Sequence, residues 1–227
     1  MLFAIADLHL SLGVDKPMDI FKGWTDYVSR LEKNWNAVVT DDDTVVIAGD
    51  ISWALKISEA VEDFKFINSL KGKKIILKGN HDLWWQTAKK INDFFNENDI
   101  DTISILHNNA YKIGDVAIAG SRGWMFDSGE DKKVLLREAG RIRASIQKAK
   151  QLGCGTPIVF LHYPPIYKDA VCDEIMEVLK SEGITKCYYG HIHGAGANSA
   201  VRGLYDGIDF HLISCDTMDF TPLFIAR

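Results

Sequence analysis

Lys73-Lys74-Ile75-Ile76-Leu77-Lys78-Gly79-Asn80-His81-Asp82 is the stretch that decides how this chain folds. Residues 73–78 are predicted as a strand, with the apolar residues Ile75, Ile76 and Leu77 at its centre. The strand runs into a Gly-Asn turn, followed directly by an imidazole and a carboxylate. An amide oxygen can bind a metal, an imidazole can move a proton, and a carboxylate can hold that imidazole in one tautomer. Taken alone such a turn is more often structural, so its meaning depends on the other strand ends.

Two further apolar runs, residues 2–6 and 44–48, are predicted as buried strands of the same sheet. Asp7 and His9 follow the first run, and their spacing places both side chains on one face of an extended backbone. Asp50 follows the second. Residues 20–39, 58–70 and 83–96 predict intervening helices, the second with Ser58 as N-cap. The first half therefore alternates strand and helix, which indicates parallel strands.

The second half departs from this alternation. Gly114-Asp115 lies between β-branched residues and predicts an antiparallel hairpin over residues 111–120, where a second sheet begins. Helices are expected over residues 130–152 and 169–181, and further strands over 103–106, 158–161, 185–189, 208–212 and 223–225. His162 ends one of these strands, and His191 with His193 ends another.

Five strand ends thus carry side chains that bind metal ions. The set is Asp7, His9, Asp50, Asn80, His162, His191 and His193. Each one alone fits a turn, a helix cap or a hydrogen-bonded core histidine, but those explanations do not account for the joint pattern. Ligands of α/β sheets bind beyond the carboxyl ends of the strands, so we expect the seven to converge. Oxygen and nitrogen donors without a thiolate suit Mn, Fe or Zn.

This ordered series resembles the motifs of the calcineurin-like metallophosphoesterase family: Asp7-x-His9, Gly49-Asp50, Gly79-Asn80-His81-Asp82, His162 and Gly190-His191-x-His193. The resemblance implies an α/β fold in which helices flank two facing mixed β-sheets, a four-layer α-β-β-α sandwich. It implies two divalent metal ions, the first held by Asp7, His9 and His193 and the second by Asn80, His162 and His191, with Asp50 between them. It also implies that His81 contacts the scissile phosphate and the leaving oxygen, and that Asp82 orients His81.

The reaction implied by the resemblance is hydrolysis of a phosphate ester or anhydride of a small molecule. A metal-bridging hydroxide would attack in line, and a protonated His81 would stabilise the leaving oxygen. Two alternatives stay open: a nuclease or phosphodiesterase acting on nucleic acid, and a catalytically silent metal-binding scaffold. The net charge of −5, with both signs interleaved, offers no dedicated surface for nucleic acid or a membrane. Monoester, diester and pyrophosphate substrates, the native metals and the oligomeric state are left open.

Three residues beside the motifs are candidate substrate contacts. Arg122 can clamp a phosphate with its guanidinium fork, although a loop arginine often has no such role. Trp53 and Tyr163 can stack on a base or cover an apolar leaving group, and the alternative for both is core packing.

The composition is that of an ordinary globular protein, with 47% hydrophobic and 25% charged residues in 227 positions. We expect one domain over residues 1–227 and a cytoplasmic location. The apolar start at residues 1–6 has no basic leader, and no apolar run is long enough to span a membrane. The cysteines form no C-x-x-C pair and are expected as reduced, mostly buried thiols. They are Cys154, Cys172, Cys187 and Cys215.

Overall fold

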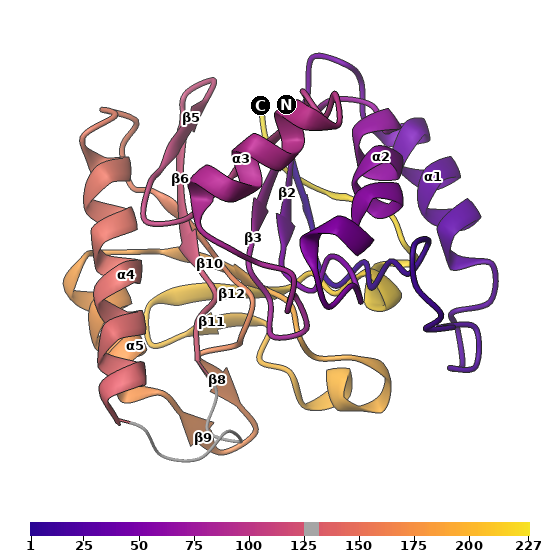
Figure 1. Ribbon diagram of the computed structural model, residues 1–227. Coiled ribbons are helices and arrows are strands. Elements are labelled where there is room, and N and C mark those ends of the chain that lie inside the picture. The colour runs from indigo at the N-terminus through magenta and orange to yellow at the C-terminus, as the bar shows by residue number, and fades with distance from the viewer. Residues whose placement is uncertain (125–131) are drawn as a thin grey trace.

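The computed structural model describes residues 1–124 and 132–227. Two mixed sheets face each other, with α1, α2 and α3 covering one and α4 and α5 covering the other (Figure 1). The predicted four-layer sandwich is therefore confirmed. Its layers place the carboxyl ends of the parallel strands of both sheets at the metal-ligand motifs.

The first sheet has the strand order β13-β1-β2-β3-β4, and β13 is antiparallel to β1 while the others run parallel. Its strands are β1 (Leu2–Ile5), β2 (Thr44–Ala48), β3 (Lys73–Leu77), β4 (Ile103–Ile105) and β13 (Leu223–Ala226). The covering helices are α1 (Tyr27–Val38), α2 (Val61–Ser69), preceded by the short 3₁₀ turn η1 (Ile57–Glu59), and α3 (Ala88–Glu97).

The second sheet has the order β11-β12-β10-β7-β6-β5, with parallel central strands and an antiparallel strand at each edge. Its strands are β5 (Tyr111–Ile113), β6 (Val116–Ser121), β7 (Ile158–Leu161), β10 (Lys186–Tyr189), β11 (Gly203–Tyr205) and β12 (Ile208–Leu212). The helices α4 (Lys132–Lys150) and α5 (Asp173–Ser181) cover it. Smaller elements are the hairpin β8 (Ile166–Tyr167) and β9 (Ala170–Val171), with the 3₁₀ turns η3 (Gly194–Ser199) and η4 (Cys215–Met218).

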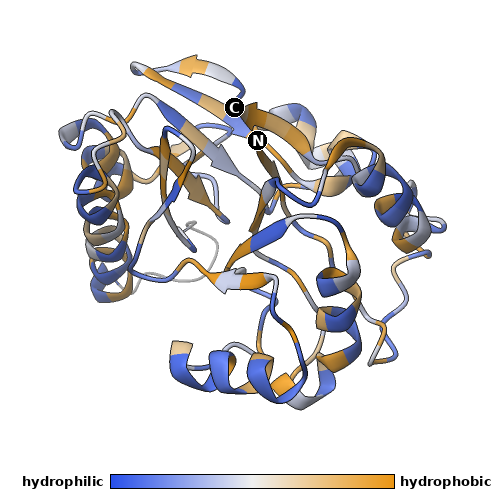
Figure 2. Ribbon diagram, turned by 90° about the horizontal axis from the view of Figure 1, so that it is seen from above, coloured by the Kyte–Doolittle hydropathy of each residue, from blue (hydrophilic) through white to orange (hydrophobic). Residues whose placement is uncertain are grey.

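The alternation of side chains along the strands separates three apolar cores. On β1, Ala4 packs between the two sheets while Phe3 and Ile5 pack under the helices of the first sheet. Across the gap, Phe160 belongs to the same central core as Ala4. Figure 2 shows hydrophobic colour mainly on the central strands and mixed colour on the outer helices. Each buried large apolar side chain contributes about 1.5–3 kcal/mol, against about 0–1 kcal/mol for a surface ion pair, so the cores hold the layers together.

Several predicted helix boundaries are wrong. The helix expected over residues 20–39 begins only at Tyr27, because Gly23 and Asp26 have positive φ angles of 90° and 52°. The helix expected from residue 83 begins at Ala88, where the Thr87 side chain accepts a hydrogen bond from the Lys90 N–H.

Other departures are smaller. Ser58 does not cap α2 but lies inside η1. The hairpin of β8 and β9 takes the place of the first turn of the helix predicted from residue 169, and β11 was not predicted. Residues 130 and 131, the predicted start of α4, lie outside the described residues.

All four cysteines are free thiols, three of them buried. Within the described ranges, no helix has the length and apolar character needed to cross a lipid bilayer.

Candidate metal centre

The ligand candidates follow β1, β2 and β3 of the first sheet and β7 and β10 of the second, so two sheets contribute to one site. Their side chains lie in two groups, in each of which the donor atoms are within 4.8 Å of one another. The groups are Asp7, His9 and His193, and Asp50, His162 and His191. The structure thus brings together six of the seven predicted ligands, and Asn80 joins the second group through His162.

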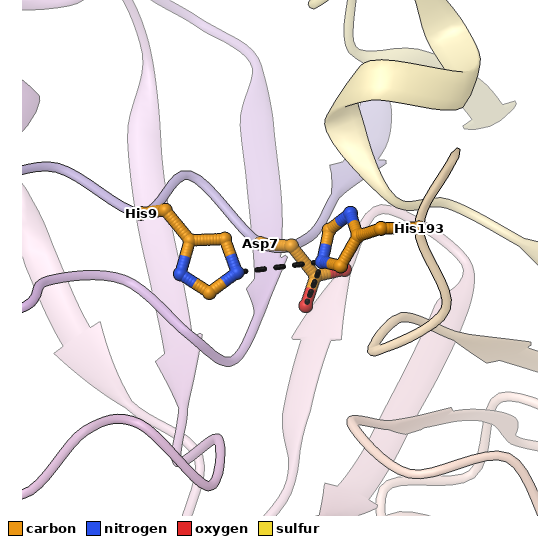
Figure 3. A group of neighbouring side chains, drawn as sticks. All are labelled: Asp7, His9 and His193. Atoms are coloured by element: carbon orange, nitrogen blue, oxygen red, sulfur yellow. Dashed lines mark hydrogen bonds and ion pairs between the residues drawn. The ribbon is translucent and has the colours of Figure 1, made fainter. Parts of the chain in front are cut away.

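The first group has its donor atoms turned toward one space (Figure 3). Nε2 of His193 lies 3.3 Å from Nε2 of His9 and 3.6 Å from Oδ1 of Asp7. Nδ1 of His193 donates to Oδ1 of Asp216 at 2.9 Å, which keeps its Nε2 turned toward the site.

The second group is centred on His162, which is fully buried. Its Nδ1 donates to the Ala48 carbonyl at 3.1 Å, and its Nε2 lies 2.7 Å from Oδ1 of Asn80 and 3.4 Å from Oδ2 of Asp50. The same Asp50 oxygen is 3.7 Å from Nε2 of His9. Asp50 therefore lies between the two groups.

The backbone at four of these ligands is strained. Asp7, His9, Asp50 and His191 have φ angles of 62°, 46°, 49° and 71°, each in the left-handed region. This corrects the expectation that Asp7 and His9 share a face of an extended strand: they meet because both residues kink. Such conformations cost roughly 1–3 kcal/mol each and are concentrated at functional sites.

Two motif positions must be glycine because a metal-ligand candidate lies too close to allow a Cβ atom there. A Cβ on Gly79 would lie 2.1 Å from the Asp50 backbone nitrogen, and one on Gly190 would lie 2.5 Å from Oδ2 of Asp7. The Asp50 carboxylate accepts the His81 N–H at 2.8 Å, and the Asp7 carboxylate accepts the His191 N–H at 2.9 Å. Each carboxylate is therefore held by the backbone of a neighbouring motif loop.

The carboxylates and imidazoles of the site shift one another's pKa values. Burial raises the pKa of Asp50, and the adjacent charge of Asp7 raises it further. Burial also acts to raise the pKa of Asp7, but His193, His162 and His9 lower it below its usual value. Burial lowers the pKa of His9 to about 3, so that imidazole is neutral. Burial opposes a charge on His193, yet Asp7 and Asp216 raise its pKa to about 10.

These observations fit divalent metal ions. Burial lowers the pKa of His162, so its ring is neutral and its proton is on Nδ1. The lone pair of its Nε2 therefore faces the Asn80 oxygen, an arrangement that a shared cation relieves. Two nearby buried carboxylates, beside the neutral imidazoles of His9, His162 and His191, supply the donor set and negative charge that such ions require.

His81 and Asp82 have separate roles. The half-buried His81 ring lies 5.6 Å from the His9 ring and 4.4 Å from the Trp53 ring, at the entrance to the site. Asp82 is fully buried, and among the described residues its carboxylate binds groups other than the His81 ring that it was predicted to orient. Its carboxylate accepts the N–H groups of Gly79 at 2.7 Å and Ile51 at 2.8 Å. Asp82 therefore fastens the loops after β2 and β3 to each other.

The three candidate substrate contacts lie around the site. Trp53 stacks on His9 with ring centroids 4.8 Å apart, and Tyr163 lies 4.4 Å from the His191 ring. Arg122 is behind the second group, where its carbonyl accepts the His162 N–H at 3.1 Å. His81 and Trp53 line a cavity of about 580 Å³ together with Lys16, Leu55 and Leu83.

Sequence reasoning missed Asp216 and Trp24. Asp216 follows β12, and the rule that polar residues at strand ends build the site would have found it. The Trp24 ring lies 5.8 Å from both the His9 and His193 rings, and no sequence motif marks it.

Comparisons with known proteins agree with this geometry. A model of the calcineurin-like phosphoesterase family matches residues 2–195. A protein of unknown function from Aquifex aeolicus aligns at 16% identity over 98% of this chain and 94% of its own, with a TM-score of 0.51. A protein of Thermus thermophilus aligns at 12% identity over 85% of this chain and 81% of its own, with a TM-score of 0.56.

These two structures show a shared fold and nothing of the substrate. A phosphopantetheinyl hydrolase from Mycobacterium tuberculosis aligns at 13% identity over 94% of this chain and 88% of its own, with a TM-score of 0.49, too low to support an argument. No curated protein matches the chain.

Proposed function

The chain belongs to the calcineurin-like phosphoesterase family, and from this premise we propose that it is a dinuclear metal-dependent phosphohydrolase that cleaves a phosphate ester or anhydride. The observation that carries the proposal is the position of Asp50 between the two donor groups. One carboxylate within reach of both groups is what a pair of metal ions sharing a ligand requires.

The first ion would be held by Asp7, His9 and His193, and the second by Asn80, His162 and His191, with Asp50 shared. When bound, two divalent ions neutralise phosphate oxygens and lower the pKa of water. The protein's part is to hold the donors in place. The Ala48 carbonyl sets the tautomer of His162, and Asp216 sets that of His193.

His81 is the residue proposed to contact substrate. It lies beside the ligands, and its backbone N–H donates to Asp50 at 2.8 Å, so its loop is attached to the metal centre. Burial lowers the pKa of His81, so the ring is neutral at pH 7 until an anionic phosphate arrives and favours the protonated form. The imidazolium would then donate to an oxygen of the phosphate or of the leaving group.

The cavity of about 580 Å³ beside His81 is the proposed path by which substrate reaches the metal centre. Leu55 and Leu83 line it with mostly exposed side chains, and Lys16 holds its ammonium 4.8 Å from the centre of the Trp53 ring. Asp15 and Glu59 also line this cavity, so its apolar walls favour an apolar part of the substrate, and its charges do not favour an anionic one.

The test combines metal content with hydrolysis. The protein would be assayed on an aryl monophosphate, an aryl phosphodiester and an oligonucleotide with added Mn, in wild type and Asp50→Asn. Asp93→Asn, on the exposed face of α3, is the control. We expect about two metal ions per chain in wild type and Asp93→Asn, and hydrolysis at least about a hundredfold slower in Asp50→Asn.

Two further readouts separate the alternatives. Because Asp50 and Asp7 repel each other in a buried site, metal-free Asp50→Asn should melt at a higher temperature than metal-free wild type. A wild type that binds two metals yet hydrolyses none of the three substrates would favour the scaffold, and cleavage of the oligonucleotide alone would favour the nuclease.

A further inference from the structure

A second cavity, of about 320 Å³, lies where the segments after β3, β4 and β6 meet α4. Lys78 follows β3, His107 follows β4, Arg122 follows β6, and Arg141 lies on α4; all four line the cavity. Arg122 touches the metal centre through its carbonyl, which accepts the N–H groups of His162 at 3.1 Å and Tyr163 at 2.8 Å. Lys78 directly precedes the Gly-Asn-His-Asp motif. The cavity and the metal centre therefore share two chain segments.

The cavity has a surplus of positive charge. Among the described residues, three cations line it, Lys78, Arg122 and Arg141, against one carboxylate, Glu138. Glu138 is buried, and it already accepts hydrogen bonds from Ser121 Oγ, the Gly123 N–H and Arg141. In a chain with a net charge of −5, such a surplus in one cavity is a local feature that the overall composition does not explain.

Within residues 1–124 and 132–227, two of the three cations make no ion pair. Arg141 pairs with Glu138 at 3.0 Å, but neither Lys78 nor Arg122 makes an ion pair with any residue in the described ranges. The Arg122 guanidinium lies over the Trp124 ring, 5.1 Å from its centre, which leaves its N–H fork unused by carboxylates. Burial lowers the pKa of His107, and the positive charges of Arg141 and Lys78 lower it further. The surplus of positive charge therefore also acts on the His107 side chain.

We propose that this cavity binds a second phosphate group of the substrate, while the scissile phosphate lies at the metal centre. That the ligand is the substrate rests on the proposed function. That the ligand is an anion rests on the residues of the cavity alone. A phosphate monoester carries about −1.5 to −2 charges at pH 7, which matches the surplus, and arginine forks bind phosphate oxygens in pairs. The substrate class is therefore a small molecule with two phosphate groups.

Anion binding is tested without catalysis. The full chain, dialysed against a chelator, would be titrated with inorganic phosphate at constant ionic strength balanced by chloride, with thermal unfolding as the readout. We expect phosphate to stabilise the wild type, and Arg122→Gln and Arg141→Gln each to weaken its apparent affinity at least about tenfold. Arg137 is exposed and lies on α4, the helix of Arg141, but outside the cavity, so Arg137→Gln is expected to match wild type.

A fold defect is separated from a lost anion contact by Arg141→Lys, which keeps the charge and is expected to recover part of the affinity. Phosphate held at the metal ligands instead would bind all these variants alike. Equal affinity in wild type, Arg122→Gln and Arg141→Gln, or no phosphate effect in wild type, overturns the proposal.

Kinetics then identify the ligand as substrate. On a sugar bisphosphate, Arg141→Gln should raise KM at least about tenfold, and by a much larger factor than on an aryl monophosphate, while Arg137→Gln should match wild type on both substrates. Equal losses on both substrates overturn the subsite and leave the hydrolase intact. If the arginine variants lose phosphate binding but wild type hydrolyses neither substrate, the anion site stands and the proposed function is wrong.

Discussion

Nδ1 of His193 lies 2.9 Å from Oδ1 of Asp216, and the other oxygen of that carboxylate accepts the Gly194 N–H at 2.9 Å. Asp216 thus fixes both the ring of His193 and the backbone that follows it. The His193 Nε2 is left to face Asp7 and His9, the other members of its group. The tautomer and direction of one ligand candidate are therefore set by a residue outside the metal-ligand motifs.

Asp216→Ala should weaken metal binding. Removing the partner of a ligating imidazole releases its tautomer and orientation, for which we expect about a 10–100-fold loss of metal affinity. Metal titration by calorimetry measures it. Asp209→Ala, which removes the partner of His211 at 2.9 Å in β12, is the matched control and should bind metal like wild type. Equal affinity in Asp216→Ala and Asp209→Ala would contradict the role of Asp216.

His81→Gln should keep both metals and lose most turnover. The side chain is not a member of either donor group, while general acid contributions amount to about 10²–10⁴-fold in rate. Metal content and kcat on an aryl monophosphate, measured on one preparation, test this. A variant that loses a metal ion would make His81 a ligand and refute its contact with substrate.

Gly79→Ala should disrupt the centre even though it removes no donor atom. The added methyl group would lie 2.1 Å from both the backbone nitrogen and the Oδ1 atom of Asp50, so the loops after β2 and β3 must separate. We expect a loss of about 2 kcal/mol or more in unfolding free energy, with weaker metal binding. Gly153→Ala is the control, because a Cβ there has open space although its φ is also positive, at 71°. If both variants bind metal equally well, close approach is not the reason for the motif glycine.

Lys74 predicts a pH dependence of stability. Burial lowers its pKa from 10.5 to about 8, and its ammonium group donates to the Leu70 carbonyl at the end of α2. Between pH 8 and pH 10.5 the unfolded chain holds this proton while the folded chain does not, so stability rises with pH over that range. The loss of stability caused by burying the charged Lys74 is full below pH 8 and disappears as the pH approaches 10.5.

Relative to Lys74→Met, wild type should therefore gain stability from pH 8 to pH 10.5, measured by urea unfolding. Lys73→Met, at the exposed neighbouring position, reports any general effect of removing a lysine from β3. A stability gap between wild type and Lys74→Met that stays constant with pH would contradict the shift.

Much of the fold follows from local patterns. The apolar runs that become β1, β2, β3, β7 and β10 are strands because their side chains are buried on both faces, and the Gly114-Asp115 turn marks the start of the second sheet. Helix starts were less predictable. Apolar spacing continues through Ile20 and Phe21, but those residues are exposed and the helix begins after the left-handed Asp26.

The residue types of the candidate centre were determined by sequence alone, because oxygen and nitrogen donors after buried strands are a local pattern. What only the tertiary structure decided is how those residues meet. Asp7 and His9 converge through left-handed kinks, and Asp82 holds two loops together where its neighbour His81 was the expected partner.

The cavity of Lys78, Arg122 and Arg141 likewise joins segments from both sheets and a helix. Sequence spacing predicts which residues follow a strand and on which face of the sheet their side chains lie. The partner across a loop, and the charge that gathers in a cavity, depend on how the two sheets pack, and no single segment contains that information.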